Sequence, residues 1–537
     1  MQAKTLPRDN AAAHYDAARR LVDLGRDDEA SKRLDAAIAA RPDFAEAFSL
    51  GGYILERAGR AETAMRFYRR ALELKTDLTA AWSNLAKLLL RQGAFADALR
   101  AIDETLRRLP GDADAWNTRS GVTRALGQLE ESEMAARKAL RLRAKFPEAA
   151  VNLGTALLKS ARPEAALAAY ATAASLRKNF ADAICGQALA YRALDRLDEA
   201  RGAFDRAVKL DCREAVSGRG CLDLMLGDFE KGWEGYEARW VDRKPVAEAL
   251  GVRYPLWKGP NSPPQRVLVI NDHGLGDTIQ FARYLPLMSK AGAEPHFLCP
   301  AKLHPLIGPL VEGRIFEREP QELKFDAQIA ISSLPRAFAT RLDSIPADRP
   351  YLSAEAARVA RWALRMGESG FKVGCVWQGN PNPEADTARS FPLSALAPLA
   401  AIPGVRLISL QRGFAEEQLW ESPPLFGIER LSADYDAGGP AFLDAAAVMM
   451  KLDLVVSCDT SIAHLAGALG RPVWTALKQD AEWRWLRATS VSPWYPTMRL
   501  FRQPTAGEWG PVFDAMAANL ACLAKGPGFA DGQGSET

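Results

Sequence analysis

Residues 267–286 read VLVINDHGLGDTIQFARYLP, and this stretch is the clearest indicator of fold class in the chain. The apolar run from Val267 to Ile270 predicts a buried strand, and the residues from Leu275 onward have the spacing of a helix. The two glycines between them allow a tight turn and the close approach of a ligand. They lie at the carboxyl end of the strand, where open α/β sheets bind their ligands. Asp277 directly follows the second glycine, and spacing alone favours a helix-capping role for its carboxylate.

Short apolar runs alternate with helical segments from here towards the end of the chain. This alternation predicts βα units and parallel sheet. A helical connector between roughly 336 and 370, which contains YLSAEAARVARWALRMG, is placed to join two α/β halves. The predicted strands are Val267–Ile270, Pro295–Cys299, Ala327–Ile331, Val373–Trp377, Val405–Leu410, Leu454–Ser457 and Val473–Ala476.

The first part of the chain repeats itself every 34 residues. The repeating turn position is occupied by Gly25, Gly59, Gly93, Gly127, Ala161 and Asp195. Small residues recur five positions after it (Ala30, Ala64, Ala98, Ser132, Ala166, Ala200) and seven positions before it (Ala18, Gly52, Ala86, Ser120, Gly154, Ala188). Large apolar residues recur at Phe48, Trp82, Trp116 and Ile184. The period predicts stacked helical hairpins, in which the glycine makes the turn and the small residues let paired helices approach closely.

The pattern resembles the tetratricopeptide repeat, with six units over about residues 11–212. A seventh step places Gly227 two residues early, which indicates a modified capping repeat and extends the array to about residue 240. Such arrays hold a peptide or protein in their concave face, and a spacer or dimerisation element is the alternative. Proline and glycine in 241–265 predict a linker, and the low apolar content of 526–537 predicts a disordered tail.

The composition is that of an ordinary soluble protein with two or three domains. Of 537 residues, 48% are apolar and 25% are charged, and the net charge of +3 gives no reason to expect a nucleic-acid partner. Seven scattered cysteines without a C-x-x-C pattern indicate reduced thiols and argue against a metal cluster. No segment approaches the ~18 uncharged apolar residues of a membrane span, and MQAKTLPRDN lacks the apolar core of a signal peptide. We therefore expect a cytoplasmic protein.

Two further stretches carry chemical signals. In SCDTSIAHLAGALGRP, residues 457–472, hydroxyls and free N–H groups at a helix start form a cradle for a diphosphate, with His464 one turn further on. Ordinary helix capping and a packed histidine are the alternatives. In VGCVWQGNP, residues 373–381, a polar loop again follows a strand, and Arg389 comes shortly after it. Arg389 can pair with a phosphate through two hydrogen bonds or be a solvated surface charge.

Taken in order, these motifs resemble the glycosyltransferases of the heptosyltransferase class (family 9), and more closely the bacterial branch in which such a transferase follows tetratricopeptide repeats. The matching stretches are LGDFEKGWEGYEARW, GLGDTIQFARYLP, VWQGNP with RSFPL, LISLQRG at 407–413, DTSIAHLAGALG, and WRWL with SPWYPTMRLFRQ between 483 and 503. The resemblance spans about residues 11–525. It implies a GT-B fold, with a Rossmann-like acceptor half at 266–350 and a Rossmann-like donor half at 351–525.

The resemblance also implies roles for single residues. Asp277 matches the general base, which takes the proton from an acceptor hydroxyl. Where relatives often carry Glu-Gln, this chain has Asp272-His273, so His273 can share the proton role or contact the acceptor. Arg389 matches a position that neutralises the leaving diphosphate. The implied donor and phosphate site also contains Gly274, Gly276, Asp459, Thr460, Ser461 and His464, and the implied nucleotide contacts are Ser409, Leu410 and Gln411.

The implied reaction is an inverting sugar transfer from a nucleotide-sugar co-substrate, without a metal or another cofactor. Relatives with this layout include enzymes that modify flagellin, so a flagellin Ser or Thr delivered by the repeats is a candidate acceptor. Lipopolysaccharide or another glycan as acceptor, and a non-catalytic repeat scaffold, are the alternatives. Asp434-Tyr435-Asp436 imitates the D-x-D metal motif of another transferase class, but it precedes a helix, and we interpret it as a turn and helix cap.

Overall fold

The structure is a computed structural model that describes residues 8–240, 251, 254–263, 265–347, 350–381, 388–420 and 426–524. The predicted tail at 526–537 and most of the predicted linker at 241–265 lie outside the described residues. The chain forms two compact units, Met1–Ala190 and Tyr191–Thr537. Within the described residues, no helix has both the length and the apolar character that crossing a membrane requires.

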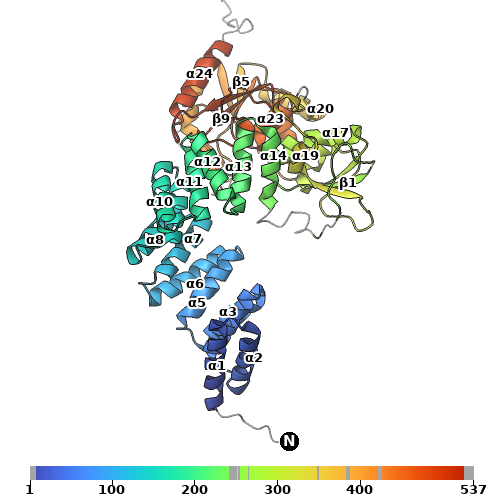
Figure 1. Ribbon diagram of the computed structural model, residues 1–537. Helices are drawn as coiled ribbons and strands as arrows, with labels where there is room; N and C mark the ends of the chain where they lie inside the picture. Colours follow the sequence, from blue (N-terminus) through green and yellow to red (C-terminus); the bar gives the residue numbers. More distant parts are fainter. Residues whose placement is uncertain are drawn as a thin grey trace, which may run out of the picture. The chain divides into compact units, whose positions relative to one another are not determined.

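Paired helices make up the N-terminal part of the chain, as the repeat predicts (Figure 1). They are α1 (Arg8–Asp23), α2 (Asp27–Ala40), α3 (Ala45–Arg57), α4 (Ala61–Leu74), α5 (Thr79–Arg91), α6 (Phe95–Arg108), α7 (Ala113–Ala125), α8 (Leu129–Leu142), α9 (Pro147–Lys159), α10 (Pro163–Leu176), α11 (Ala181–Ala193), α12 (Leu197–Val208), α13 (Arg213–Met225) and α14 (Phe229–Tyr236), followed by the short η1 (Glu237–Trp240). The boundary between the units falls within α11. Helices α12, α13 and α14 therefore belong to the same compact unit as the sheets.

The turns inside these pairs adopt the left-handed backbone conformation. The angle φ is 72° to 77° at Gly25, Gly59, Gly93 and Gly127, and 56° and 60° where Ala161 and Asp195 take the same position. Glycine suits this conformation because it has no Cβ to clash with the backbone. Gly227 also has a positive φ, of 87°, between α13 and α14. The predicted turn positions are confirmed, and the early glycine is the turn of a seventh pair.

The recurring small residues are buried between the helices of each pair. A Cβ atom on Gly52 would lie 2.8 Å from a ring carbon of Tyr68. Ser120 Oγ donates to the Ser132 carbonyl at 2.9 Å, and Ser132 Oγ donates back to the Ser120 carbonyl at 2.8 Å. Larger side chains at these positions would push the helices apart, which explains the predicted pattern.

Two separate parallel sheets follow, as expected for two Rossmann-like halves. The first has the order β3-β2-β1-β4, and the second has the order β10-β9-β8-β5-β6-β7. The strands of the first sheet are β1 (Arg266–Ile270), β2 (Glu294–Leu298), β3 (Ile315–Phe316) and β4 (Ala327–Ala330). Those of the second are β5 (Phe371–Val376), β6 (Val405–Ser409), β7 (Glu429–Arg430), β8 (Leu454–Cys458), β9 (Val473–Leu477) and β10 (Met498–Arg502). All seven predicted strands are present, while β3, β7 and β10 were not predicted.

Short helices connect these strands. In the first half they are α16 (Leu275–Phe281), η2 (Ala282–Tyr284), α17 (Leu285–Lys290), η3 (Ala301–Leu303), α18 (His304–Ile307), η4 (Gly308–Leu310), η5 (Ile331–Ser333), α19 (Leu334–Ala337) and η6 (Leu342–Ser344). In the second half they are η7 (Leu393–Leu396), α21 (Ala397–Ala400), η8 (Glu416–Trp420), α22 (Leu443–Met449), α23 (Ser461–Ala468), η9 (Trp483–Trp485) and α24 (Gly510–Ala524). The predicted connector between the halves is confirmed as α20 (Ala356–Met366).

Part of the predicted linker packs on the first sheet. The Trp257 backbone N–H donates to the Gln328 carbonyl at 2.9 Å, and the Gln328 N–H donates to the Pro255 carbonyl at 2.8 Å. The Trp257 side chain is buried and contacts the ring of Phe338. These residues therefore extend the edge of the sheet beside β4.

Candidate active site between the two sheets

Asp277 lies in the first turn of α16, directly after the loop that follows β1. Helix α16 begins after Gly274, and no side chain caps its N-terminus. The Asp277 carboxylate instead accepts a 2.6 Å hydrogen bond from Arg484, which lies beyond β9 in the second half. The helix-capping role that spacing favours is therefore wrong. Spacing cannot reveal a partner that is 207 residues away.

The charges around Asp277 determine its protonation. Burial alone would raise the pKa of this carboxyl, but the positive charges of Arg484 and His273 and the hydrogen bond from Arg484 lower it to about 2. Asp277 is therefore ionised at neutral pH. A carboxylate held by an arginine is also a weak proton acceptor, because protonation would break the ion pair.

Residues 459–464, which the resemblance assigns to the donor site and which we call the donor segment, lie between the end of β8 and the first turn of α23. Thr460 is the N-cap residue of α23 without a side-chain capping bond, and its hydroxyl lies 3.0 Å from that of Ser457. Asp459 accepts a 2.8 Å hydrogen bond from Trp485 Nε1. Burial and the nearby Glu482 raise the pKa of Asp459 to about 6, although Arg484 and the Trp485 bond oppose this rise. Since no side chain occupies the helix start, its N–H groups can receive an anion.

His464 is one turn into α23 and is 3% exposed. Its Nδ1 lies 3.0 Å from the Tyr495 hydroxyl, and its ring stacks on Trp485 with 5.4 Å between centroids. Burial and the positive charge of Arg484 lower the pKa of His464 to about 3, so the ring is neutral at pH 7.

Gly276 brings the two segments together. A Cβ atom at this position would lie 2.8 Å from His464 Cδ2 and 3.3 Å from Ser461 Cα. Helices α16 and α23 can contact each other here because residue 276 has no side chain. The loop of the first sheet and the donor segment of the second sheet are therefore direct neighbours.

The loop after β5 forms a third wall. A Cβ atom on Gly379 would lie 2.8 Å from Arg389 Nη2, so the guanidinium packs directly over this loop. Gln411 holds the loop in place. Its Oε1 accepts from the Trp377 and Gln378 N–H groups, and its Nε2 donates to the carbonyls of Gln378 and Phe414. Because both the oxygen and the nitrogen of its amide are hydrogen-bonded to backbone groups, the Gln411 side chain supports this wall of the cavity.

These segments enclose a cavity of about 870 Å³. Ten of the twelve predicted site residues line it, namely Gly274, Gly276, Asp277, Arg389, Leu410, Gln411, Asp459, Thr460, Ser461 and His464. Sequence reasoning assigned no role to other polar residues in the lining, including Lys302, Arg412, Glu482 and Arg484. The signal that could have found Arg484 is its position between two tryptophans in the quoted WRWL stretch.

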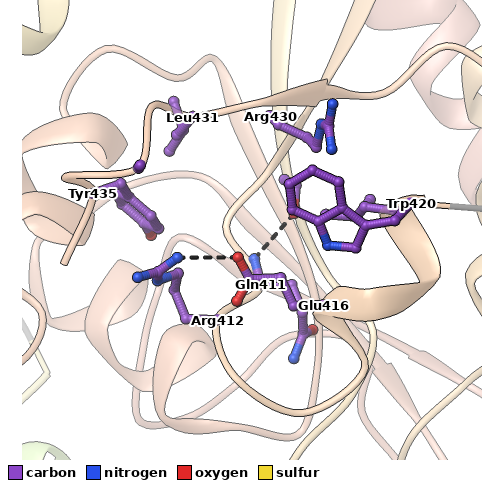
Figure 2. A pocket seen from close by; sticks show the side chains of 10 residues that line it. Gln411, Arg412, Glu416, Trp420, Arg430, Leu431 and Tyr435 are labelled. Atoms are coloured by element: carbon purple, nitrogen blue, oxygen red, sulfur yellow. Dashed lines mark hydrogen bonds and ion pairs between the residues drawn. The ribbon is translucent and has the colours of Figure 1, made fainter. Parts of the chain in front are cut away.

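A smaller cavity of about 400 Å³ shares Gln411, Arg412 and Tyr435 with the larger one. Ser409 lines this smaller cavity. Figure 2 shows the Trp420 ring beneath the Arg430 side chain, whose guanidinium carbon lies 4.0 Å from the ring centroid. The Arg412 side chain donates to Glu416 at 3.0 Å. The smaller cavity thus offers a flat aromatic wall beside charged groups.

His273 is the remaining predicted residue and is not among the residues that line the larger cavity. Its Nε2 lies 3.2 Å from the Tyr236 hydroxyl of α14, and its Nδ1 lies 2.9 Å from Asp272 Oδ2. Burial lowers the pKa of His273, but Asp272 and Asp277 outweigh this effect and raise it above the ordinary value. His273 therefore links the last repeat helix to the β1 loop.

Asp436 confirms the interpretation of the D-x-D sequence as a turn and cap. Its Oδ1 accepts a 3.0 Å hydrogen bond from the Asp444 N–H at the start of α22. Asp434 forms an ion pair with Arg365 at 2.8 Å. Each carboxylate therefore has a structural partner.

Comparisons with known proteins agree with the repeat architecture. Tetratricopeptide repeat models match residues 15–78, 55–120 and 151–218, so the chain contains tetratricopeptide repeats. A solved tetratricopeptide repeat protein from Parabacteroides merdae is 18% identical, with a TM-score of 0.40, and the match covers 45% of this chain and 97% of that one.

Two curated proteins are also similar. The chain is 28% identical over 505 residues to Protein FlbA of Caulobacter vibrioides, which covers 87% of this chain and 82% of FlbA. It is 32% identical over 106 residues to the probable biofilm formation methyltransferase WspC of Pseudomonas aeruginosa, which covers 20% of this chain and 25% of WspC. Since the helical pairs end by residue 240, a match over 87% of the chain includes part of the α/β region.

Proposed function

We propose that this protein is an inverting glycosyltransferase, which moves a sugar from a nucleotide-sugar donor to a hydroxyl group of a protein acceptor. The observation that supports this most strongly is the shared cavity of about 870 Å³. It is lined by Asp277 of the first half and, from the second half, by Asp459, Thr460, Ser461, Ile462 and His464. A base and an anion-binding helix start that face one cavity are what a displacement at a sugar carbon requires.

The donor diphosphate would bind at the start of α23, between the side chains of Arg389 and Arg484. Fixed N–H groups and two guanidinium groups stabilise the charge that develops on a leaving diphosphate, and this accounts for a metal-independent reaction. The nucleoside would extend past Leu410 towards the smaller cavity, where Ser409 and the exposed Trp420 ring lie (Figure 2).

Asp277 would act as the general base. It takes the proton of the acceptor hydroxyl while that oxygen forms a bond to the anomeric carbon, and the bond from this carbon to the diphosphate oxygen breaks with its electron pair. A single displacement of this kind inverts the anomeric configuration. His273 would act indirectly, since its ring contacts Asp272 and Tyr236 and its charge acts on Asp277.

The repeats would bind the protein that carries the acceptor hydroxyl, because tetratricopeptide arrays present a concave surface to a peptide or protein. A flagellin Ser or Thr is the candidate acceptor. Mass spectrometry of flagellin from a strain that lacks this protein distinguishes this acceptor from lipopolysaccharide or another glycan. We expect flagellin to lose the mass of its sugars, and unchanged flagellin would rule out this acceptor.

The proposed activity is tested with purified protein, a panel of nucleotide sugars and flagellin. We expect release of the nucleotide and an added sugar mass on flagellin, and Asp277→Asn should slow transfer by about 10²- to 10⁴-fold because it removes the base. The control is Asp514→Asn, an exposed residue of α24, which should transfer at the wild-type rate. Transfer by Asp277→Asn at the wild-type rate would refute the base assignment, and a wild-type protein inactive with every donor would refute the function.

A further inference from the structure

Arg484 lies between two carboxylates of the candidate site, those of Asp277 and Glu482. It is 6% exposed and belongs to η9, which follows β9. Its Nη2 lies 2.6 Å from Asp277 Oδ1 and 2.8 Å from Glu482 Oε2. Its Nη1 donates to the side-chain oxygen of Gln280 in α16. The guanidinium therefore ties the second sheet to the proposed base of the first sheet.

The tryptophans on either side hold Arg484 in this position. Trp485 donates its Nε1–H to Asp459 at 2.8 Å and stacks on His464. Trp483 packs edge-on against Trp233 of α14, with 5.2 Å between the ring centroids. The triplet Trp483-Arg484-Trp485 thus contacts the last repeat helix, the base and the donor segment in three consecutive residues.

The ion pair opposes the role that we propose for Asp277. A carboxylate that accepts a charged hydrogen bond from arginine is stabilised in its ionised form and takes up a proton poorly. Arg484 also lines the cavity in which the diphosphate would lie. Arg484 already forms ion pairs with Asp277 and Glu482. A bound diphosphate would bring several negative oxygens within reach of the same guanidinium, so the diphosphate and Asp277 compete for it.

We propose that Arg484 is exchanged between Asp277 and the donor diphosphate, so that the carboxylate becomes an effective base only when a donor is bound. This inference rests on the proposed glycosyltransferase function. The exchange makes base activation depend on donor binding, which prevents Asp277 from abstracting protons in the empty site.

The surroundings of Asp277 define what a pH measurement can report. The charged and titratable groups that face it, directly or through Arg484, are Arg484 and Glu482 from the η9 segment, His273 from its own loop, His464 from α23, Asp459 from the end of β8 and Tyr236 from α14. Among these, Arg484 is the cation that hydrogen-bonds to the Asp277 carboxylate.

The experiment compares the pH dependence of donor turnover in the wild type, Arg484→Gln and Arg484→Lys. The profile of kcat/KM reports the free enzyme, and that of kcat reports the donor complex. If Arg484 leaves Asp277 in the complex, Arg484→Gln should shift the acidic limb of kcat/KM upward by about one pH unit or more and leave that of kcat nearly in place. Arg484→Lys should reverse part of the shift. Equal shifts of both limbs, or no shift, would overturn the exchange.

A second measurement separates this inference from the proposed function. Calorimetric titration with inorganic pyrophosphate should show binding that weakens about tenfold or more in Arg484→Gln. Arg487→Gln is the matched control, because Arg487 lies three residues further on and forms its ion pair with Asp195. Wild-type affinity in Arg484→Gln would overturn the exchange even if sugar transfer is confirmed. If Arg484→Gln weakens pyrophosphate binding as expected but the wild-type protein transfers no sugar, the proposed function would instead be overturned.

Discussion

His464 is a histidine that the fold keeps neutral inside the donor segment, and its environment predicts how stability depends on pH. Its pKa is lowered to about 3 from an ordinary 6.5. Between these values the unfolded chain binds a proton that the folded chain does not. The contribution of the neutral His464 ring to the stability of the folded state is therefore complete above pH 6.5, and it is lost as the pH falls from 6.5 towards 3.

Between pH 7 and pH 5, His464 should account for a loss of about 2 kcal/mol in the free energy of unfolding. Urea unfolding at the two pH values, followed by tryptophan fluorescence, measures this loss. The signal reports mainly the second unit, because 11 of the 13 tryptophans follow residue 190 and only Trp82 and Trp116 precede it. His464→Gln should be less stable at pH 7 but should lose about 2 kcal/mol less on acidification. An equally steep pH dependence in the variant would contradict the assignment.

At the residue scale, the sequence predicted which residues line the cavity better than it predicted their hydrogen-bond partners. Asp277, Arg389 and His464 were found because each lies in a short motif at a strand end, where parallel sheets gather ligands. Arg484 was missed because its role depends on a contact across 207 residues. His273 was placed at the reaction because it is near Asp277 in sequence, whereas its ring is committed to Asp272 and Tyr236. Local motifs do not determine such side-chain directions.

At the scale of elements, helix α14 belongs to the α/β core as much as to the repeats. Trp233 is 3% exposed and donates its Nε1–H to the Thr340 carbonyl at 2.8 Å. Its ring packs against Phe229, Trp483 and Trp494. The early Gly227 therefore marks the point where the repeat pattern gives way to packing against the sheets.

Trp233→Ala should reduce the free energy of unfolding of the second unit by about 3–5 kcal/mol, because it leaves a large cavity in this aromatic cluster. Trp233→Phe keeps most of the ring but leaves the Thr340 carbonyl unpaired, and should cost about 1–3 kcal/mol. Urea unfolding followed by fluorescence measures both variants. Trp82→Ala in α5 is the control, since it belongs to the first unit and should leave the unfolding of the second unit unchanged. A mild effect of Trp233→Ala would show that α14 is dispensable for the α/β core.

The same scale explains which strands could be predicted. The seven predicted strands are apolar runs of four to six residues, and hydrophobic pattern is a strong signal for such buried segments. Strands β3 and β7 have only two residues each, which is too short for any periodicity. In β10 the sequence MRLFR places Arg499 and Arg502 among apolar residues, and only Met498 and Leu500 are buried. These residues belong to the SPWYPTMRLFRQ motif, and no strand was predicted there.

At the scale of the whole molecule, the repeat period and the compact units do not end at the same residue. The 34-residue series continues to Asp195, but the second unit begins at Tyr191. Periodicity reports how each helix pair is built and cannot report what the last pairs pack against. A truncation chosen from the repeat alone would therefore cut through the core of the α/β unit.

Two truncations test this division. The chain 179–537 keeps α11 to α14 and should fold, bind inorganic pyrophosphate within about threefold of the full chain and hydrolyse the donor, since the site residues and their supports all follow residue 190. It should lose about tenfold or more of its transfer to a protein acceptor, because most of the repeats are gone. The chain 241–537 lacks the side chains of Trp233 and Tyr236 that pack against Trp483 and His273, and should show no cooperative unfolding. Calorimetric titration and urea unfolding distinguish the two truncations.

If 241–537 folds and binds pyrophosphate, the last helical pair, α13 and α14, is not part of the core. If 179–537 modifies the acceptor as fast as the full chain, the first unit does not deliver it.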